Sequence, residues 1–212
     1  DVDRAASILR FPLFVKHYSS YASVDISRRS RVRTPAGLRI QARKIMSRHG
    51  AALIEEYIEG TECTVLVAEN PDDPRRPVTY TPAQYRFPKG EHFKHSDLKW
   101  VEYEGLSSSP VEDPELAARL RDECARFFVQ LKAASFGRCD LRVDRTGTPY
   151  MLEINANCGI YYPPADYGSA DIVLSLDPAG HEGFTRQLVA AAFARHARRH
   201  GPWLAPAAAP VI

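Results

Sequence analysis

The fold is decided by residues 138–155, which read Arg138-Cys-Asp-Leu-Arg-Val-Asp-Arg-Thr-Gly-Thr-Pro-Tyr-Met-Leu-Glu-Ile-Asn155. Polar and apolar residues alternate on both sides of a glycine-containing turn over residues 145–148, which predicts two antiparallel strands. The expected register places Asp144 opposite Pro149, Arg142 opposite Met151, Asp140 opposite Glu153 and Arg138 opposite Asn155. Side chains two apart share a face of a strand, so Arg138, Asp140, Glu153 and Asn155 should point the same way.

This shared face predicts a cation site. Two carboxylates directly across an antiparallel pair repel each other, and a cation between them removes that cost. Asp140, Glu153 and Asn155 offer the hard oxygen donors that Mg²⁺ prefers. Arg138 has the planar geometry that suits phosphate or an oxyanion. An exposed hairpin whose charges face water would show the same pattern, so the hairpin alone leaves both interpretations open.

Bulk composition narrows the class of protein. The 212 residues are enough for one domain or two small lobes, and 44% hydrophobic with 25% charged residues is typical of a soluble globular chain. A net charge of +2 gives no reason to expect a nucleic-acid or membrane partner. No apolar run approaches the roughly 20 residues that span a bilayer, and the first residues do not resemble a signal peptide. Four cysteines without zinc-like spacing indicate free thiols in a reducing cytoplasm.

Local patterns predict the other elements. We expect a strand over residues 11–16, a helix from Thr34-Pro35 to Gly50, and strands over 52–57 and 62–68. A further strand over 78–85 precedes a loop-rich segment, 87–110. Apolar residues at helical spacing indicate a helix beginning at Pro114, and a second amphipathic helix covers about 182–198. The proline- and alanine-rich end reads as a flexible tail.

Other short segments carry candidate ligands. Residues 53–65 form a strand–turn–strand whose backbone groups suit the edge of an adenine ring, and Glu62 beyond the turn could accept hydrogen bonds from ribose. A plain hairpin with charged turn residues is the alternative. Lys16 ends an apolar strand before a serine-rich loop, where a point charge suits phosphate. Surface lysines without a ligand would show the same sequence pattern as Lys16 and Lys99. These segments therefore leave open whether the two lysines bind phosphate or only face solvent.

The order of these elements resembles the ATP-grasp superfamily, and more closely the D-alanine–D-alanine ligases. The resemblance covers roughly residues 10–200, and its most specific parts are Glu-Glu-Tyr-Ile-Glu-Gly-Thr-Glu62 and the hairpin with the following Gly159. It implies an α+β ATP-grasp fold with two lobes clamping a nucleotide. The smaller lobe would be residues 1–60, the larger 61–200, and the flexible tail 201–212.

The resemblance also implies a role for each candidate residue. Lys16 would hold the α- and β-phosphates of ATP, Glu55 the adenine amino group, and Glu62 the ribose. The backbones of Glu56 and Ile58 would complete the adenine edge, and Lys99 would close over the γ-phosphate. Asp140, Glu153 and Asn155 would bind Mg²⁺. Arg138 would steady the transferring phosphoryl group and the tetrahedral intermediate, and the Gly159 N–H would act as an oxyanion donor.

The implied activity is that of a cytoplasmic, Mg²⁺-dependent, ADP-forming carboxylate–amine ligase working through an acyl phosphate. Its ligands would be ATP and small amino-acid or carboxylate substrates. The alternative is a non-catalytic nucleotide-binding module of a larger protein. Residues 21–25, Tyr-Ala-Ser-Val-Asp, depart from the glycine- and serine-rich phosphate loop of the family, which leaves the use of D-alanine open. The family's N-terminal substrate-binding domain is not visible, so such a domain or a second copy of the chain is the expected partner.

Overall fold

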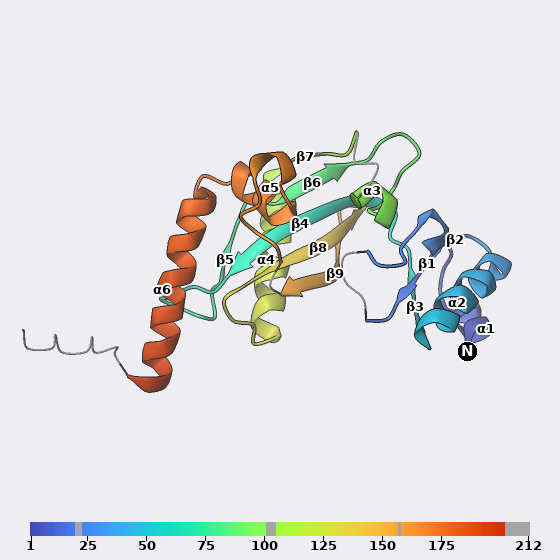
Figure 1. Ribbon diagram of the computed structural model, residues 1–212, viewed down its shortest axis with the longest axis horizontal. Coiled ribbons are helices and arrows are strands. Elements are labelled where there is room, and N and C mark those ends of the chain that lie inside the picture. Colours follow the sequence, from blue (N-terminus) through green and yellow to red (C-terminus); the bar gives the residue numbers. More distant parts are fainter. Residues whose placement is uncertain (20–22, 101–104, 157, 202–212) are drawn as a thin grey trace, which may run out of the picture. The chain divides into compact units, whose positions relative to one another are not determined.

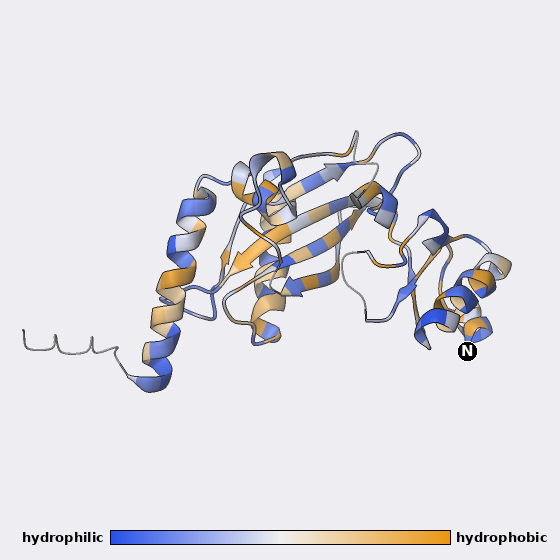
Figure 2. Ribbon diagram, viewed as in Figure 1, coloured by the Kyte–Doolittle hydropathy of each residue, from blue (hydrophilic) through white to orange (hydrophobic). Residues whose placement is uncertain are grey.

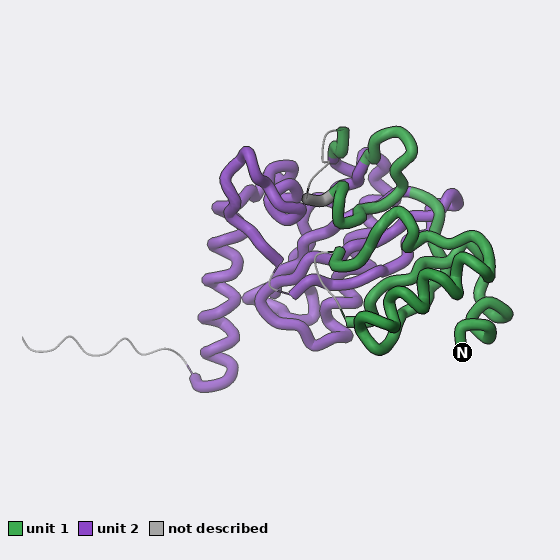
Figure 3. The backbone as a smooth tube through the Cα atoms, turned by 45° about the vertical axis from the view of Figure 1, so that its right-hand side comes forward, with its two compact units in different colours: residues 1–60, 86–107 green, residues 61–85, 108–212 purple. Residues whose placement is uncertain are grey.

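The chain forms two compact units, coloured separately in Figure 3. The computed structural model describes residues 1–19, 23–100, 105–156 and 158–201. Unit 1 contains residues 1–60 and 86–107, and unit 2 contains residues 61–85 and the chain from 108 onward. Segment 86–107 therefore groups with unit 1, whereas the sequence places it in the larger lobe. The division into nucleotide-clamping lobes stays a prediction, and the expected tail after Gly201 lies outside the described residues.

Unit 1 is a small antiparallel sheet covered on one face by helices. Its strand order is β2 (Arg31–Val32), β1 (Leu13–His17) and β3 (Ala52–Glu56). The helices α1 (Val2–Ile8) and α2 (Pro35–His49) pack on it, and η1 (Arg28–Ser30) and α3 (Ser96–Trp100) complete the unit. Leu13 and Val15 of β1 are buried against α2. The alternating residues Phe14 and Lys16 therefore lie on the opposite face of the sheet.

The helix α2 begins and ends at the residues that the sequence predicts. The Thr34 side chain accepts a hydrogen bond from the Gly37 N–H, with Pro35 in the first turn. Gly50 follows the last helical residue with a φ of 80°, a backbone conformation that favours glycine.

Unit 2 is built on a larger antiparallel sheet. Its strands run in the order β7 (Ser107–Pro110), β6 (Ala83–Arg86), β4 (Gly60–Ala68), β8 (Phe136–Asp144) and β9 (Pro149–Ala156), and β5 (Val78–Thr79) pairs with β4. The helix α4 (Pro114–Gln130) covers one face (Figure 1). The helices α5 (Ser169–Leu176) and α6 (Gly180–His200) follow the 3₁₀ turn η2 (Pro164–Asp166) and bury the opposite face around Leu66 and Ala68. Both units combine helices with antiparallel sheets, which confirms the α+β class.

Alternation along β8 separates the core from a polar face. Cys139, Leu141 and Val143 are buried in the cluster under α4. The alternate residues Arg138, Asp140 and Arg142 point to the other side of the sheet. Figure 2 shows this as bands of hydrophilic and hydrophobic colour along the strand. The part of that face nearest the turn between β8 and β9 is not buried by α5 or α6, so the polar residues gather there.

The hairpin confirms the expected pairing at the carboxylates and corrects it at the turn. Arg138 lies opposite Asn155 and Asp140 opposite Glu153. A β-bulge between Asp140 and Leu141 shifts the remaining register, so Arg142 lies opposite Tyr150 rather than Met151, and Val143 rather than Asp144 lies opposite Pro149. Asp144 is the last residue of β8, and its carboxylate accepts hydrogen bonds from the Thr146 and Thr148 N–H groups of the turn. β8 ends at Asp144 and β9 begins at Pro149, so the turn consists of the predicted residues 145–148.

The sequence patterns do not predict several of the shorter elements. The single strand expected over 78–85 is divided into β5 and β6, which are separated by residues 80–82. The helices α1, α3 and α5 and the strands β2 and β7 were not predicted, because each is too short to show a clear period. Across the parts of the chain that the structure describes, every helix is too short or too polar to cross a membrane.

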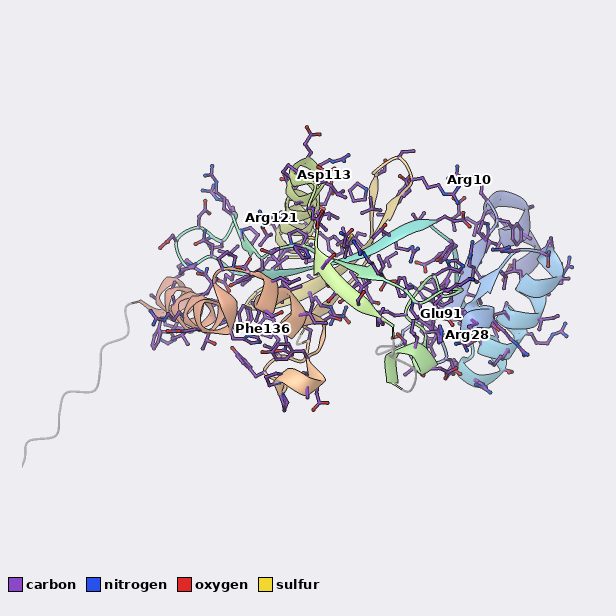
Figure 4. The ribbon with its side chains drawn as sticks, turned by 90° about the horizontal axis from the view of Figure 1, so that it is seen from above. Arg10, Arg28, Glu91, Asp113, Arg121 and Phe136 are labelled. Carbon is purple, nitrogen blue, oxygen red and sulfur yellow. The ribbon has the colours of Figure 1, made fainter. Side chains whose placement is uncertain are left out.

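The N-cap of α4 gives a test of the fold. The Asp113 side chain, at the start of α4 in Figure 4, accepts hydrogen bonds from the N–H groups of Glu115 at 2.9 Å and Leu116 at 3.3 Å. We expect Asp113→Ala to lower the free energy of unfolding by about 1 kcal/mol, because two helix-end N–H groups lose their acceptor. Urea unfolding measures the change. The neighbouring exposed Glu112→Ala should have little effect, and equal losses in the two variants would contradict the capping role.

Candidate functional site

The Asp140 carboxylate is the centre of the polar face of unit 2. Arg138 donates to it twice, from Nε to Oδ1 at 3.0 Å and from a terminal nitrogen to Oδ2 at 2.8 Å. The Thr64 hydroxyl on the neighbouring strand β4 donates to Oδ1 at 2.8 Å, and the Asn155 amide donates to Oδ2 at 2.9 Å. Three strands therefore hold one carboxylate in a defined orientation.

Charge is partly balanced at this centre. Burial disfavours the charged form of Arg138, but the Asp140 carboxylate and its hydrogen bonds outweigh that effect, so the pKa of Arg138 lies above its usual value. The guanidinium is therefore a permanent positive charge beside Asp140. The exposed Glu153 carboxylate lies directly opposite Asp140. Two carboxylates against one guanidinium leave room for a further cation.

Asn155 bridges the two carboxylates. Its Nδ2 donates to Asp140 at 2.9 Å and to Glu153 Oε1 at 3.2 Å. Turning the same amide about its last bond would present its oxygen instead, and the three side chains would then offer only hard oxygen donors. This donor set fits Mg²⁺, which keeps several waters and needs few protein ligands. Within the described residues no cluster of three or more His, Cys, Asp and Glu side chains is placed to hold a metal, so the amide is needed to complete the set.

The predicted ribose ligand is buried beside the same centre. Glu62 Oε2 lies 3.4 Å from a terminal nitrogen of Arg142, and both side chains are at least nine-tenths buried. Arg142 shares the face of Arg138 and Asp140 on β8. The structure thus adds Arg142 and Thr64 to the polar face. Alternation of Glu62 with Thr64, and of Asp140 with Arg142, is the signal in the sequence that could have found them.

The loop after β9 places Gly159 against an aromatic ring. A Cβ on Gly159 would lie 2.4 Å from the Tyr162 hydroxyl, so a larger residue there would displace the Tyr162 ring. The preceding Cys158 does not qualify as a nucleophile, because burial raises the pKa of its thiol to about 11. The loop therefore offers a backbone N–H rather than a reactive side chain.

Unit 1 brings the other predicted ligands onto one sheet. Lys16 Nζ lies 2.8 Å from Glu55 Oε2, so the proposed phosphate and adenine ligands form an ion pair with each other. Glu56 points to the other face, where Arg10 donates to it from its backbone and its guanidinium. Those hydrogen bonds, first of all the side-chain bonds from Arg10, hold the pKa of Glu56 below its usual value. Ile58 lies in the short connection between β3 and β4.

Lys99 lies in the helix α3, whereas the sequence predicts a loop at this position. The segment before α3 is fastened to the rest of unit 1. Arg28 Nε donates to Glu91 at 2.6 Å, and these two residues are labelled in Figure 4. The buried His95 ring contacts Glu91 through Nε2 at 2.9 Å and accepts the Leu98 N–H through Nδ1. Residues 21 and 22 of the unusual phosphate loop lie outside the described residues, while Asp25 pairs with Arg48 and His49.

The architecture defines the class of protein. The D-alanine–D-alanine ligase from Coxiella burnetii matches with a TM-score of 0.65 and 16% identity, over 93% of this chain and 49% of that chain. The Bacillus anthracis enzyme complexed with ATP matches with a TM-score of 0.65 and 19% identity, over 94% of this chain and 58% of that chain. These similarities establish the fold, which is the predicted ATP-grasp fold.

Sequence comparison then gives the family. The model described as D-ala D-ala ligase C-terminus matches residues 2–162, and the chain belongs to that family. The uncharacterized protein y4sG of Sinorhizobium fredii is 32% identical over 180 residues, covering 82% of this chain and 49% of the relative. The D-alanine–D-alanine ligase of Nitrosospira multiformis is 29% identical over 167 residues, covering 76% and 49%. The chain spans about half the length of these relatives.

The buried Glu62–Arg142 pair gives a second test. We expect Arg142→Met to lower the free energy of unfolding by about 3 kcal/mol, because the Glu62 carboxylate stays buried without its cation. Adding Glu62→Gln should restore part of that loss, which a double-mutant cycle by urea unfolding measures. Arg121→Met, at an exposed position of α4, is the control and should change stability by less than about 0.5 kcal/mol. Additive effects of the two core substitutions would contradict the pairing.

Proposed function

We propose that the chain is the ATP-binding part of a Mg²⁺-dependent, ADP-forming carboxylate–amine ligase. The observation that carries the proposal is the polar face of unit 2, where Arg138, Asp140, Glu153 and Asn155 converge on one sheet. Membership of the D-ala D-ala ligase C-terminus family supports it. The chain is similar to the D-alanine–D-alanine ligases of Nitrosospira multiformis and Bacillus anthracis, and the second of these was solved with ATP.

The resemblance to the family assigns nucleotide contacts to residues of each unit. From unit 1, Lys16 would hold the α- and β-phosphates, Glu55 the adenine amino group, and the backbones of Glu56 and Ile58 the adenine edge. From unit 2, Glu62 would accept hydrogen bonds from the ribose. Asp140, Glu153 and Asn155 would hold Mg²⁺, which when bound neutralises phosphate charge. The α3 segment would bring Lys99 to the γ-phosphate, where a dry site strengthens its charge interaction.

The proposed reaction has two steps. A carboxylate oxygen of the first substrate attacks the γ-phosphorus, and the bond from that phosphorus to the β-phosphate oxygen breaks, releasing ADP. The amine of the second substrate then attacks the acyl carbon, the carbon–oxygen bond to phosphate breaks, and the amine loses a proton. Arg138 would stabilise the charge on the transferring group, and the Gly159 N–H would donate to the oxyanion. Neither step needs a nucleophilic side chain, in keeping with the raised pKa of Cys158.

Compartment and partners follow from the same proposal. Cys63, Cys124, Cys139 and Cys158 are free thiols, which suits a reducing cytoplasm where ATP is also available. The substrates would be small amino or carboxylic acids. A substrate-binding region, in the rest of the protein or in a second copy, would complete the site. Residues 21–25 lack the family's glycine–serine pattern, which favours an acid other than D-alanine.

Metal dependence tests the binding half of the proposal. We expect Asp140→Asn and Glu153→Gln each to weaken Mg²⁺-dependent ATP binding at least about tenfold, because one hard anionic ligand is lost. Calorimetry with and without Mg²⁺ measures this, and Asp122→Asn on the exposed face of α4 is the matched control. Equal affinity of the unaltered protein with and without Mg²⁺ would rule out the metal site.

Turnover tests the catalytic half. We expect the full-length protein to release ADP when supplied with the right pair among D- and L-amino acids, and Lys99→Ala to reduce that turnover about 100-fold while ADP binding persists. The reason is that ADP lacks the phosphate that Lys99 would meet. Lys89→Ala, exposed in the same segment, is the control. ATP hydrolysis that no candidate substrate changes would favour the alternative of a non-catalytic nucleotide-binding module.

A further inference from the structure

Arg31 lies on the same face of the unit 1 sheet as the predicted nucleotide ligands. It begins β2 and pairs with Phe14 of β1, and Phe14 pairs on its other side with Glu55 of β3. Cross-strand partners share a face, so Arg31, Phe14 and Glu55 form one row across the sheet. Glu55 contacts Lys16 on this face. Its place in the sheet distinguishes Arg31 from Arg33, which is exposed two residues further on.

The Arg31 side chain contacts two residues of the connection between β3 and β4. Its guanidinium carbon lies 4.5 Å from the centroid of the Tyr57 ring, a cation–π geometry. A terminal nitrogen of the same guanidinium donates to Glu59 Oε1. Tyr57 and Glu59 are the residues on either side of Ile58, whose backbone is the proposed adenine contact. One side chain therefore holds both neighbours of that residue.

The burial of Arg31 indicates that these contacts are costly to build. Its side chain is only 10% exposed, and its Nε has no hydrogen-bond partner among the described residues. A guanidinium taken out of water is stable only when its surroundings compensate, and an apolar side chain would fill the same space at lower cost. A backbone hydrogen bond holds the first residue of the connection, since the Tyr57 N–H donates to the Pro12 carbonyl at 2.9 Å. The Tyr57 hydroxyl also donates to the His92 carbonyl at 3.0 Å. Arg31 adds side-chain contacts to Tyr57 and to Glu59, on both sides of Ile58.

We infer that Arg31 is a positioning residue that sets selectivity for adenine. It orients the Ile58 backbone by holding Tyr57 and Glu59, so that the N–H and C=O groups of the connection match the hydrogen-bonding edge of the base. The inference rests on the proposed function, because it requires that the protein bind ATP. It goes further than that function in naming an internal side chain, outside the ligand set, that decides which purine is accepted.

The experiment compares two nucleotides in the full-length protein. ITP has a carbonyl oxygen where ATP has the amino group and carries a proton on N1, so the donor and the acceptor on this edge of the base are exchanged. We expect the unaltered protein to prefer ATP, and Arg31→Met to weaken ATP binding about tenfold, the loss of one well-aligned hydrogen bond, with ITP binding changed less than about threefold. Arg31→Lys keeps the charge but not the planar stack and should fall between. Arg33→Met, exposed two residues further on, should behave as the unaltered protein.

Several outcomes would overturn the inference. If Arg31 matters only for folding, Arg31→Met lowers ATP and ITP binding equally as the thermal midpoint falls, which would overturn the inference. An unchanged preference for ATP in a folded variant would also overturn it. If Arg31→Met does not fold, Glu59→Gln removes the ion pair from the partly exposed side and should reduce the preference in the same direction. Failure of the unaltered protein to bind either nucleotide would instead reject the proposed function, and the inference with it.

Discussion

The opposition of Asp140 and Glu153 across β8 and β9 is the constraint around which the polar face of unit 2 is arranged. Two like charges at this spacing destabilise a hairpin unless neighbouring groups offset them. Arg138 supplies the charge, while Asn155 and Thr64 supply hydrogen bonds that fix the carboxylates in place. The cost is local to the sheet surface, because the opposite face of the same strands packs under α4. A stable core therefore supports an electrostatically strained face.

The bulge in the hairpin explains why this face is continuous. Without it, the register set by the turn would carry through to the carboxylates and move their pairing by one residue. The bulge absorbs Leu152, which is left half-exposed, and restores Asp140 to its place opposite Glu153. On the other side of β8, the neighbouring strand β4 places Glu62 beside Arg142 on the buried side of the polar face. Sheet geometry, rather than any single side chain, brings the charged residues together.

The sequence predicts the parts of the structure that depend on local pattern. Alternation in residues 138–155 gives the carboxylate pairing, and Thr34-Pro35 with Gly50 gives both ends of α2. It misses α5 and β2, whose lengths are too short for a period to emerge. It also misses Arg31, because burial of that residue depends on strand pairing between segments distant in the chain. The expected roles of the ligands come from resemblance, and these roles stay predictions.

Two of the proposed nucleotide ligands in unit 1 form an ion pair with each other. Lys16 and Glu55 satisfy each other at 2.8 Å, although the proposed function assigns one to phosphate and the other to an amino group. Separating such a pair costs little when each member gains a new partner of opposite polarity at once. A triphosphate would take the place of Glu55 as the partner of Lys16. The adenine amino group would take the place of Lys16 as the partner of Glu55. Binding would then exchange contacts rather than expose charges, and a nucleotide lacking either partner would leave one charge uncompensated.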